Sequence, residues 1–185
     1  MVKVLTISES QNIIKTGGKN IMEIFCDFNF RRFEENDVKT FSPIMKQSFD
    51  KDFQIHLGKD AGGPPGYNNG DFLRKWYFHN GACAYAVYKN DIPVGAICVW
   101  INDNQENYLG NVFIDPDYQN KGIGLIIWNY IEQKYPETKV WRTETPGFSI
   151  RNHYFYVNKC GFKIIKIENP KDKYDASYIL EKQMK

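Results

Sequence analysis

The chain has 185 residues, 42% of them apolar and 16% aromatic, which suits one folded domain with a sizeable core and argues against a disordered protein. Its 24 basic and 22 acidic residues leave a net charge of +2, so overall charge does not favour nucleic acid or an anionic membrane as a partner. No apolar run approaches the roughly 20 residues of a membrane span, and residues 1–8 are too short for a signal peptide. We therefore expect a cytoplasmic protein with a single domain over residues 1–185.

The cysteines and histidines have the spacing of neither a metal site nor a disulfide framework. The four cysteines are far apart and form no C-x-x-C pair, so we expect buried thiols: Cys26, Cys83, Cys98 and Cys160. The three histidines are equally scattered: His56, His79 and His153. We therefore expect no metal site.

The first third of the chain predicts one strand and two helices. Residues 2–8 form the expected strand. Residues 20–32 place apolar side chains at helical spacing, and residues 38–49 continue the helical pattern after a polar break. Glycine and proline in residues 61–67 disfavour both helix and sheet, so this segment is expected to be a loop, either a lid or a linker.

The middle of the chain predicts a hairpin and a further strand. Residues 82–89 and 93–101 alternate as strands do, and Asn90-Asp91 supplies the turn between them. The next strand, residues 109–114, stops at Asp115-Pro116, because proline forces the preceding residue out of helical geometry.

A glycine-containing turn follows this strand and opens a helix. Gly122 and Gly124 carry no Cβ, so the backbone amides of residues 119–124 can converge on an anion at the positive end of the helix dipole. The helix itself has one apolar stripe and ends near Pro136. This strand, loop and helix predict a phosphorylated ligand, most simply a pyrophosphate.

Two common nucleotide motifs do not fit the spacing. A dinucleotide-binding fold requires G-x-G-x-x-G, but Ile127 stands where the last glycine belongs. A P-loop requires G-x-x-x-x-G-K-[ST], but the Gly18-Lys19 pair has Ile13 and Asn20 at the two remaining motif positions.

The last third of the chain adds strand and helix patterns in turn. Residues 139–145 predict a strand, residues 150–158 a short helix, and residues 161–166 and 177–180 closing strands. The expected order is β-α-α-β-β-β-α-β-α-β-β, an α/β chain (α+β with a mixed sheet).

The segment Gln119-Asn120-Lys121-Gly122-Ile123-Gly124 resembles the Q/R-x-x-G-x-G/A loop of the GNAT superfamily of N-acetyltransferases. It follows a Val-Phe-Ile-Asp-Pro strand end, opens a helix, and precedes Asn152, Tyr156 and Lys159-Cys160-Gly161-Phe162, which are similar to the family's next helix and its Y-x-K-x-G-F ending. The resemblance covers residues 82–165 well. Residues 1–80 resemble the family only by position and helical pattern.

This resemblance implies the GNAT fold, with the fourth and fifth strands splayed to admit the pantetheine arm of acetyl-coenzyme A. It implies transfer of acetyl from that cosubstrate to a primary amine of a small molecule, peptide or protein, without a metal. Residues 1–80 are expected on the acceptor side and residues 82–185 in the cofactor-binding part. The residues implied to bind the cofactor are Val112, Phe113, Ile114, Gln119, Asn120, Lys121, Gly122, Ile123, Gly124, Asn152 and Tyr156.

Tyr156 is the candidate that protonates the leaving thiolate, as the family's tyrosine does. It lies five residues before Gly161 and not the usual four, where Val157 stands. One extra residue turns a helix by about 100°. Either the helix end is wound differently, or Tyr154 or another group serves, or Tyr156 packs in the core beside Phe155.

Glu144 is the candidate general base, because it stands at the end of the fifth strand in Thr-Glu-Thr-Pro, where the splay faces the acceptor site. Glu106, at the head of the fourth strand, is the rival, and water is a third choice. The amide of Asn152 either bonds the pantetheine or caps its own helix. Lys121 either contacts a phosphate or faces solvent.

A second hypothesis is a noncatalytic domain of the same fold that binds or senses acyl-coenzyme A. The glycine loop fits both hypotheses equally. Four tryptophans fall on strand or helix patterns and are expected in the core: Trp76, Trp100, Trp128 and Trp141. The sequence predicts neither the acceptor nor the oligomeric state.

Overall fold

The structure is a computed structural model that describes residues 14–16 and 22–185. Its strands form one nine-stranded sheet in the order β1-β2-β3-β4-β5-β6-β7-β9-β8. The strands are β1 (Ile14–Thr16), β2 (Met22–Phe25), β3 (Phe28–Arg32), β4 (Ala82–Lys89), β5 (Ile92–Trp100), β6 (Glu106–Ile114), β7 (Val140–Pro146), β8 (Lys163–Glu168) and β9 (Ser177–Gln183). The helices are α1 (Asp37–Leu57), α2 (Asp71–Tyr77), α3 (Ile123–Lys134) and α4 (Ile150–Tyr154), with a 3₁₀ turn at Pro116–Tyr118 and a π-helical turn at Phe155–Lys159.

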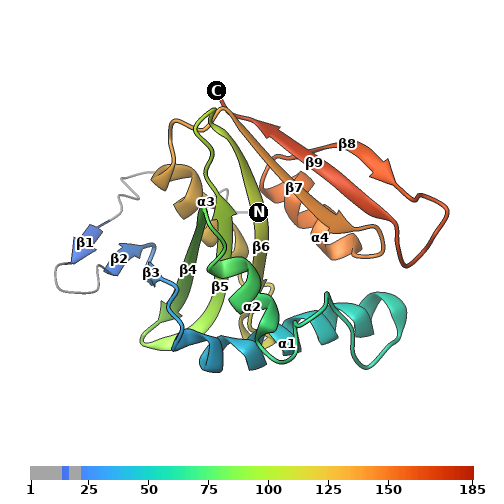
Figure 1. Cartoon of the computed structure of the whole chain (residues 1–185), viewed down its shortest axis with the longest axis horizontal. Helices are drawn as coiled ribbons and strands as arrows, with labels where there is room; N and C mark the ends of the chain where they lie inside the picture. The colour runs from blue at the N-terminus through green and yellow to red at the C-terminus, as the bar shows by residue number, and fades with distance from the viewer. Residues whose placement is uncertain (1–13, 17–21) are drawn as a thin grey trace, which may run out of the picture.

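Helices cover both faces of the sheet. In Figure 1, α2 lies in front of the strands and α3 lies behind them. One apolar cluster joins α1 and α2 to the sheet through Phe41, Met45 and Leu73. A second joins α3 to the opposite face and contains Trp128 and Trp141, both almost fully buried. The mixed α/β architecture expected from the sequence is confirmed. Among the described residues, every helix is too short or too polar to span a lipid bilayer.

The hairpin expected near residue 90 is confirmed. Strands β4 and β5 pair antiparallel, and the turn residues Asn90 and Asp91 both have positive φ, 49° and 61°. That backbone geometry favours asparagine and aspartate in two-residue hairpin turns. The following strand β6 begins at Glu106, three residues earlier than predicted.

The helix predicted over residues 20–32 is wrong from Met22 onward. This segment forms the hairpin β2–β3, with Cys26 and Asp27 at positive φ in the turn. Phe28 and Phe30 alternate inward, and the ring of Phe30 stacks on Tyr130 of α3 at 3.8 Å between centroids. Pairing of β3 with β4 therefore overrides a local spacing that a helix also satisfies. The strand expected over residues 2–8 lies outside the described residues.

The two helices before the sheet's central hairpin are α1 and α2. The predicted helix over residues 38–49 is confirmed but continues through a charged stretch to Leu57, where Gly58 ends it in the left-handed conformation. Helix α2, seven residues long, was not predicted, because it is short and begins directly after Gly70. Residues 61–67 form no regular helix or strand, as expected.

The splayed strands implied by the resemblance are present. β6 and β7 run parallel and pair only from Glu106–Val140 to Leu109–Thr143. Beyond that point the two ribbons diverge (Figure 1). β9 inserts between β7 and β8, which completes the sheet.

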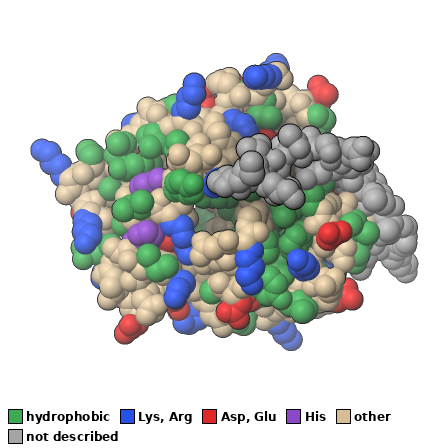
Figure 2. All heavy atoms as spheres, turned by 180° about the vertical axis from the view of Figure 1, so that it is seen from behind, with side chains coloured by type: hydrophobic (Ala, Val, Ile, Leu, Met, Phe, Trp, Pro, Cys, Tyr) green, Lys and Arg blue, Asp and Glu red, His purple; other side chains and the backbone are tan. Residues whose placement is uncertain are grey.

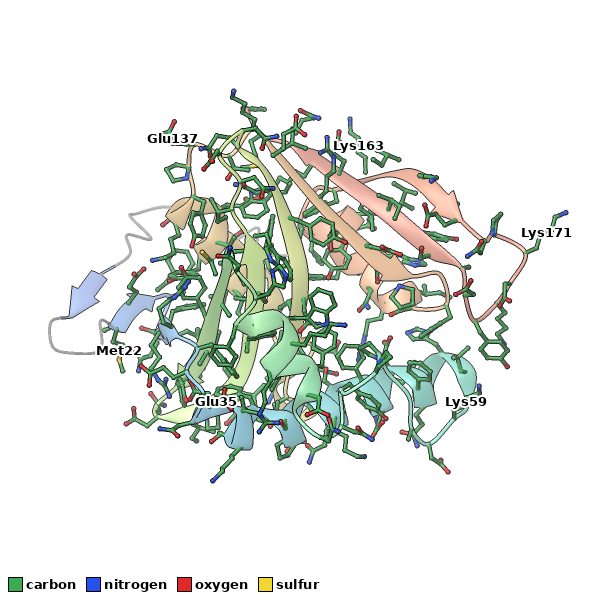
Figure 3. All side chains as sticks on the ribbon, in the orientation of Figure 1. Met22, Glu35, Lys59, Glu137, Lys163 and Lys171 are labelled. Atoms are coloured by element: carbon green, nitrogen blue, oxygen red, sulfur yellow. The ribbon has the colours of Figure 1, made fainter. Side chains whose placement is uncertain are left out.

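The C-terminal hairpin is braced against the far end of α1. Lys59 lies just past α1, Lys171 lies in the β8–β9 connection, and both are on the same side of the molecule (Figure 3). Within that connection the ring of Tyr174 lies 4.2 Å from Lys59 Nζ, which is a cation–π contact. This contact links the end of α1 to the β8–β9 connection.

The expectation of four buried thiols is correct for two. Cys98 and Cys160 are buried, whereas Cys26 and Cys83 are half-buried, and all four are unbridged. Burial raises the pKa of the Cys98 and Cys160 thiols from 9.0 to about 12. Both thiols are therefore neutral in the folded protein.

We predict that the protein loses stability above pH 9. There the unfolded chain releases the Cys98 and Cys160 protons while the folded chain keeps them, so the free energy of unfolding falls as the pH rises towards 12. By pH 10 the loss should be roughly 1 kcal/mol per thiol. Urea denaturation at pH 7 and pH 10 measures it, and Cys98→Ala should reduce the difference. Equal unfolding free energies at the two pH values would contradict the prediction.

Candidate active site

A cavity of about 490 Å³ lies beside the stretch of β6 that does not pair with β7, lined mainly from the α3–α4 side of the sheet and also by Ser48 of α1. From behind, the surface is hollowed near its middle and hydrophobic side chains gather beside the hollow (Figure 2). The lining residues come from α1, β6, the glycine loop, α3 and the helix α4 with its π-helical end. They are Ser48, Val112, Phe113, Ile114, Tyr118, Gln119, Asn120, Gly122, Ile123, Gly124, Leu125, Arg151, Asn152, Tyr154, Phe155, Tyr156 and Lys159.

The glycine loop presents a row of unpaired backbone donors. Asn120 and Gly122 have positive φ, 60° and 79°. Within the described part of the chain, the five N–H groups from Asn120 to Gly124 have no acceptor, and the first bonded amide of α3 is that of Leu125. A run of free amides at the positive end of a helix can bind an anion. The sequence predicted free amides over residues 119–124, and the structure shows them from Asn120 onward, because the Gln119 N–H donates to the Pro116 carbonyl at 3.4 Å.

The two glycines of the loop are required for different reasons. At Gly122 a Cβ would meet no atom within 4 Å, so only its left-handed backbone favours glycine. At Gly124 a Cβ would lie 2.9 Å from the ring of Phe155, so close packing of α3 against the α4 region requires its absence.

Two loop side chains are engaged within the protein. Gln119 Nε2 donates to the Ile114 carbonyl at 2.9 Å, and its Oε1 accepts from the Arg151 guanidinium at 2.8 Å. Lys121 Nζ donates to the Asp117 carbonyl at 2.7 Å. The side chain of Gln119 therefore fixes the shape of the loop. The side chain of Lys121 folds back and binds the backbone just before the loop.

Arg151 bridges the loop to α1. Besides its bond to Gln119, its guanidinium lies 3.1 Å from the carboxylate of Asp52, which is 8% exposed. His56 Nε2 lies 3.5 Å from the same carboxylate oxygen. Reasoning from sequence missed the pairing of Arg151 with Asp52, because the two residues are far apart in the chain and belong to no local motif.

β6 offers a free backbone edge to the cavity. The Leu109 carbonyl accepts from the Thr143 hydroxyl at 2.8 Å, and the Ile114 carbonyl accepts from Gln119. Between these two points β6 does not pair with β7, and Val112, Phe113 and Ile114 line the cavity. An extended ligand with amide groups could pair with this edge as a strand does.

The end of α4 resolves the register of Tyr156. The Cys160 N–H donates to the Phe155 carbonyl, five residues earlier, at 3.0 Å, so residues 155–159 form one π-helical turn. Such a turn takes up one extra residue. The helix end is thus wound differently, which is one of the alternatives left open by the sequence. Tyr156 also packs in the core beside Phe155, a second of those alternatives, with 5.1 Å between the ring centroids, and it lines the cavity at 7% exposure.

Burial also decides the state of the Tyr156 hydroxyl. Burial is the main reason that the pKa of Tyr156 is raised above the usual value for tyrosine, and a hydrogen bond with Thr143 acts in the opposite direction and lowers the pKa. The phenol is therefore protonated at neutral pH and can donate. Tyr154, the alternative, also lines the cavity but is 54% exposed.

The two carboxylates considered as bases lie in different places. Glu144 is exposed on β7, one residue beyond the last pair with β6. Glu106 lies at the opposite end of β6 and accepts from Arg142 at 2.7 Å. The opening is therefore next to Glu144 and remote from Glu106.

Asn152 lines the cavity and donates from Nδ2 to the Thr145 hydroxyl at 3.2 Å. It does not cap α4, whose N-cap residue is Ser149. Its side chain is held by β7, and its Oδ1 has no donor among the described residues. Among these residues no three His, Cys, Asp or Glu side chains gather as a metal site would require.

Comparison with known sequences identifies the family. The model of the acetyltransferase (GNAT) family matches residues 44–162, which include the cavity's loop, β6 edge and Tyr156. The chain belongs to this family. It is also 34% identical to YrkN, an uncharacterized protein of Bacillus subtilis, over 137 residues, or 74% of this chain and 73% of YrkN.

Solved structures of GNAT enzymes share the fold. The ribosomal-protein-S18-alanine N-acetyltransferase of Escherichia coli superposes with a TM-score of 0.64 at 14% identity, over 84% of this chain and 93% of the enzyme. The PaiA N-acetyltransferase of Thermoplasma acidophilum, solved in complex with coenzyme A, gives a TM-score of 0.65 at 16% identity, over 85% and 99%. At these identities the likeness concerns the fold alone.

We predict that Gly122→Ala weakens binding of coenzyme A, used as a diphosphate probe, by about tenfold, since alanine disfavours the left-handed backbone that orients the loop amides and loss of one amide donor removes a charge-assisted hydrogen bond. Gly58→Ala is the matched control, because Gly58 also has positive φ and open space around it but lies at the end of α1. Both variants should lose about 1 kcal/mol of stability. Calorimetric titration measures binding, and equal affinities for the two variants would contradict the placement.

Proposed function

We propose that the protein transfers an acetyl group from acetyl-coenzyme A to a primary amine. The observation that carries the proposal is one cavity that joins five unpaired amides, at Asn120 to Gly124, to a free strand edge and a buried tyrosine hydroxyl. These three features suit, respectively, the diphosphate, the amide-containing arm and the sulfur of that cosubstrate. The structure of the PaiA N-acetyltransferase in complex with coenzyme A supports the same cosubstrate assignment.

Each part of the cosubstrate has candidate partners in this chain. The amides of the glycine loop would hold the diphosphate, with Gln119 and Ile123 shaping the loop around it. The backbone of Val112 to Ile114 would pair with the pantetheine arm, and the Oδ1 of Asn152 is free to accept from one of its amides. Bound acetyl-coenzyme A supplies a thioester carbonyl, which a β6 amide would polarise.

The reaction requires a base and an acid. An alkylammonium with a pKa of about 10.4 must lose a proton before its nitrogen can attack the carbonyl carbon. Glu144 would take that proton, directly or through water. As the new C–N bond forms, the C–S bond breaks, and Tyr156 would protonate the departing sulfur. The products are an N-acetylated amine and free coenzyme A.

A second candidate function is a noncatalytic domain that binds or senses acyl-coenzyme A. The solvent-exposed position of Glu144, which has no ion pair or hydrogen bond in the described part of the chain, is compatible with it. The two functions differ in turnover and not in cofactor binding.

We predict amine-dependent release of thiol from acetyl-coenzyme A, measured with a thiol reagent over a panel of amines. Gly124→Glu should abolish both release and coenzyme A binding, since the side chain would add bulk against Phe155 and a negative charge beside the diphosphate. Binding by the wild-type protein with no release on any amine would favour the sensor. Unchanged affinity in Gly124→Glu would refute the placement of the diphosphate.

We predict that Tyr156→Phe lowers kcat by about tenfold, the modest end of acid catalysis, because a thiolate is a tolerable leaving group. Since burial raises the pKa of Tyr156, the wild-type kcat should not fall between pH 8 and pH 10 through loss of this acid. Tyr154→Phe is the matched control and should retain kcat. A larger effect at Tyr154 would reverse the assignment.

A further inference from the structure

We call the α1–α2 side of the opening between β6 and β7 its second mouth. Val112 and Ile114 pack towards the α3 side of the sheet, whereas Phe113 packs towards the α1–α2 side. β6 and β7 stop pairing at Leu109–Thr143, so side chains of the unpaired stretch of β6 flank the opening on both faces of the sheet. The cavity with the glycine loop is lined mainly from the α3–α4 side, and the second mouth is the part of the sheet surface that faces α1 and α2.

Trp100 lies at the apex of this second mouth. Gly110 is an extra residue in β6, since Leu109 pairs with Val99 and Asn111 with Cys98. A Cβ at Gly110 would lie 1.8 Å from the Trp100 ring. The indole therefore lies directly on the strand where β6 leaves β7.

Further aromatic rings extend from Trp100 and form a wall. Its ring centroid lies 6.3 Å from that of Tyr108 on β6 and 6.2 Å from that of Trp76 on α2. His79 lies 6.4 Å away. Trp76 and Trp100 are half-buried, unlike Trp128 and Trp141, so the expectation that all four tryptophans lie in the core is wrong for these two.

Glu144 faces the wall from β7. It follows Thr143, the last residue paired with β6, and it is exposed. On β7 it lies two residues from Arg142, which pairs with Tyr108, so it projects from the same face of the sheet as that ring. Burial and, to a smaller extent, the charge of Glu144 raise the pKa of Tyr108 to about 12. Arg142, its neighbour on the same face, is bound to Glu106 and Glu181, so Glu144 is the carboxylate at the apex left without a partner in the described part of the chain.

Asn111 supplies a polar group between the wall and the opening. The Tyr77 hydroxyl, fully buried in α2, donates to Asn111 Oδ1 at 3.0 Å. With Oδ1 engaged, the Nδ2 donors have no acceptor among the described residues and are free for a ligand.

We propose that this mouth is the acceptor site and that it takes a primary amine carried on an aromatic body. The ring of the amine would lie against Trp100 and Tyr108, and its ammonium group would reach Glu144. Aromatic contact and cation–π attraction favour such a ligand, and one unpaired carboxylate matches one positive charge. A polyamine fits less well, because Lys75 Nζ already lies 4.7 Å from the Trp76 ring centroid and would repel a further cation.

This inference rests on the proposed function, so the test separates binding from turnover. The wild-type protein, saturated with coenzyme A, is titrated calorimetrically with 2-phenylethylamine, n-hexylamine and spermidine. We expect 2-phenylethylamine to bind about fivefold more tightly than n-hexylamine, a typical effect of aromatic contact. Spermidine should bind more weakly than both. Thiol release is measured in parallel with the same amines.

Two variants locate the site. Glu144→Gln should weaken 2-phenylethylamine binding by about tenfold through loss of a charged hydrogen bond. Trp100→Leu should remove the preference over n-hexylamine, while Tyr174→Leu, at an exposed ring in the β8–β9 connection, should keep it. Because Glu144 is exposed, its variant tests the site even where Trp100→Leu fails to fold.

The outcomes are distinguishable. Equal binding of 2-phenylethylamine and n-hexylamine, or tightest binding of spermidine, would overturn this inference, and thiol release with those amines would leave the transferase proposal standing. Saturable, Glu144-dependent binding of 2-phenylethylamine without thiol release from any amine would support the site and overturn the transferase.

Discussion

The parting of β6 and β7 is the constraint on which the rest of the structure depends. The two strands share four paired positions, from Glu106–Val140 to Leu109–Thr143, and then leave a stretch of β6 unpaired. Side chains bind the backbone carbonyls at the two ends of that stretch: the Thr143 hydroxyl donates to Leu109, and the Gln119 amide donates to Ile114. An unpaired strand edge inside a protein is costly unless a ligand completes it. The cavity, the glycine loop and both mouths of the opening are arranged around this edge.

The helix after β7 shows how one residue of irregular structure positions a functional group. The spacing between Tyr156 and Gly161 is one residue longer than the usual spacing of the family. In a regular α-helix this extra residue would rotate the side chain of Tyr156 by about 100° from its usual position. The π-helical turn over residues 155–159 takes up that residue. Phe155 then packs against Gly124, and Tyr156 lines the cavity. The π-helical turn after α4 and the glycine at the start of α3 therefore allow these two helices to pack together beside the cavity.

Local signals in the sequence predicted the central fold and the anion loop. The turn at Asn90-Asp91, the strand end at Asp115-Pro116 and the glycines at 122 and 124 act within a few residues, so their geometry could be inferred directly. The hairpin β2–β3 could not, because its alternation competes with a helical spacing and only pairing with β4 decides between them. Arg151, Asp52 and the ring contact of Trp100 with Gly110 depend on packing between distant segments. These are features of the site that no local pattern encodes.

The glycine loop contributes main-chain N–H groups and not side-chain atoms. Its capacity to hold an anion therefore depends on backbone shape, set chiefly by the left-handed residues Asn120 and Gly122. Side chains that point away from the amides can be exchanged without removing a single donor. The proposed diphosphate site is consequently robust to most amino-acid replacements and vulnerable at very few positions, so a site of this kind can persist through extensive divergence of the surrounding chain.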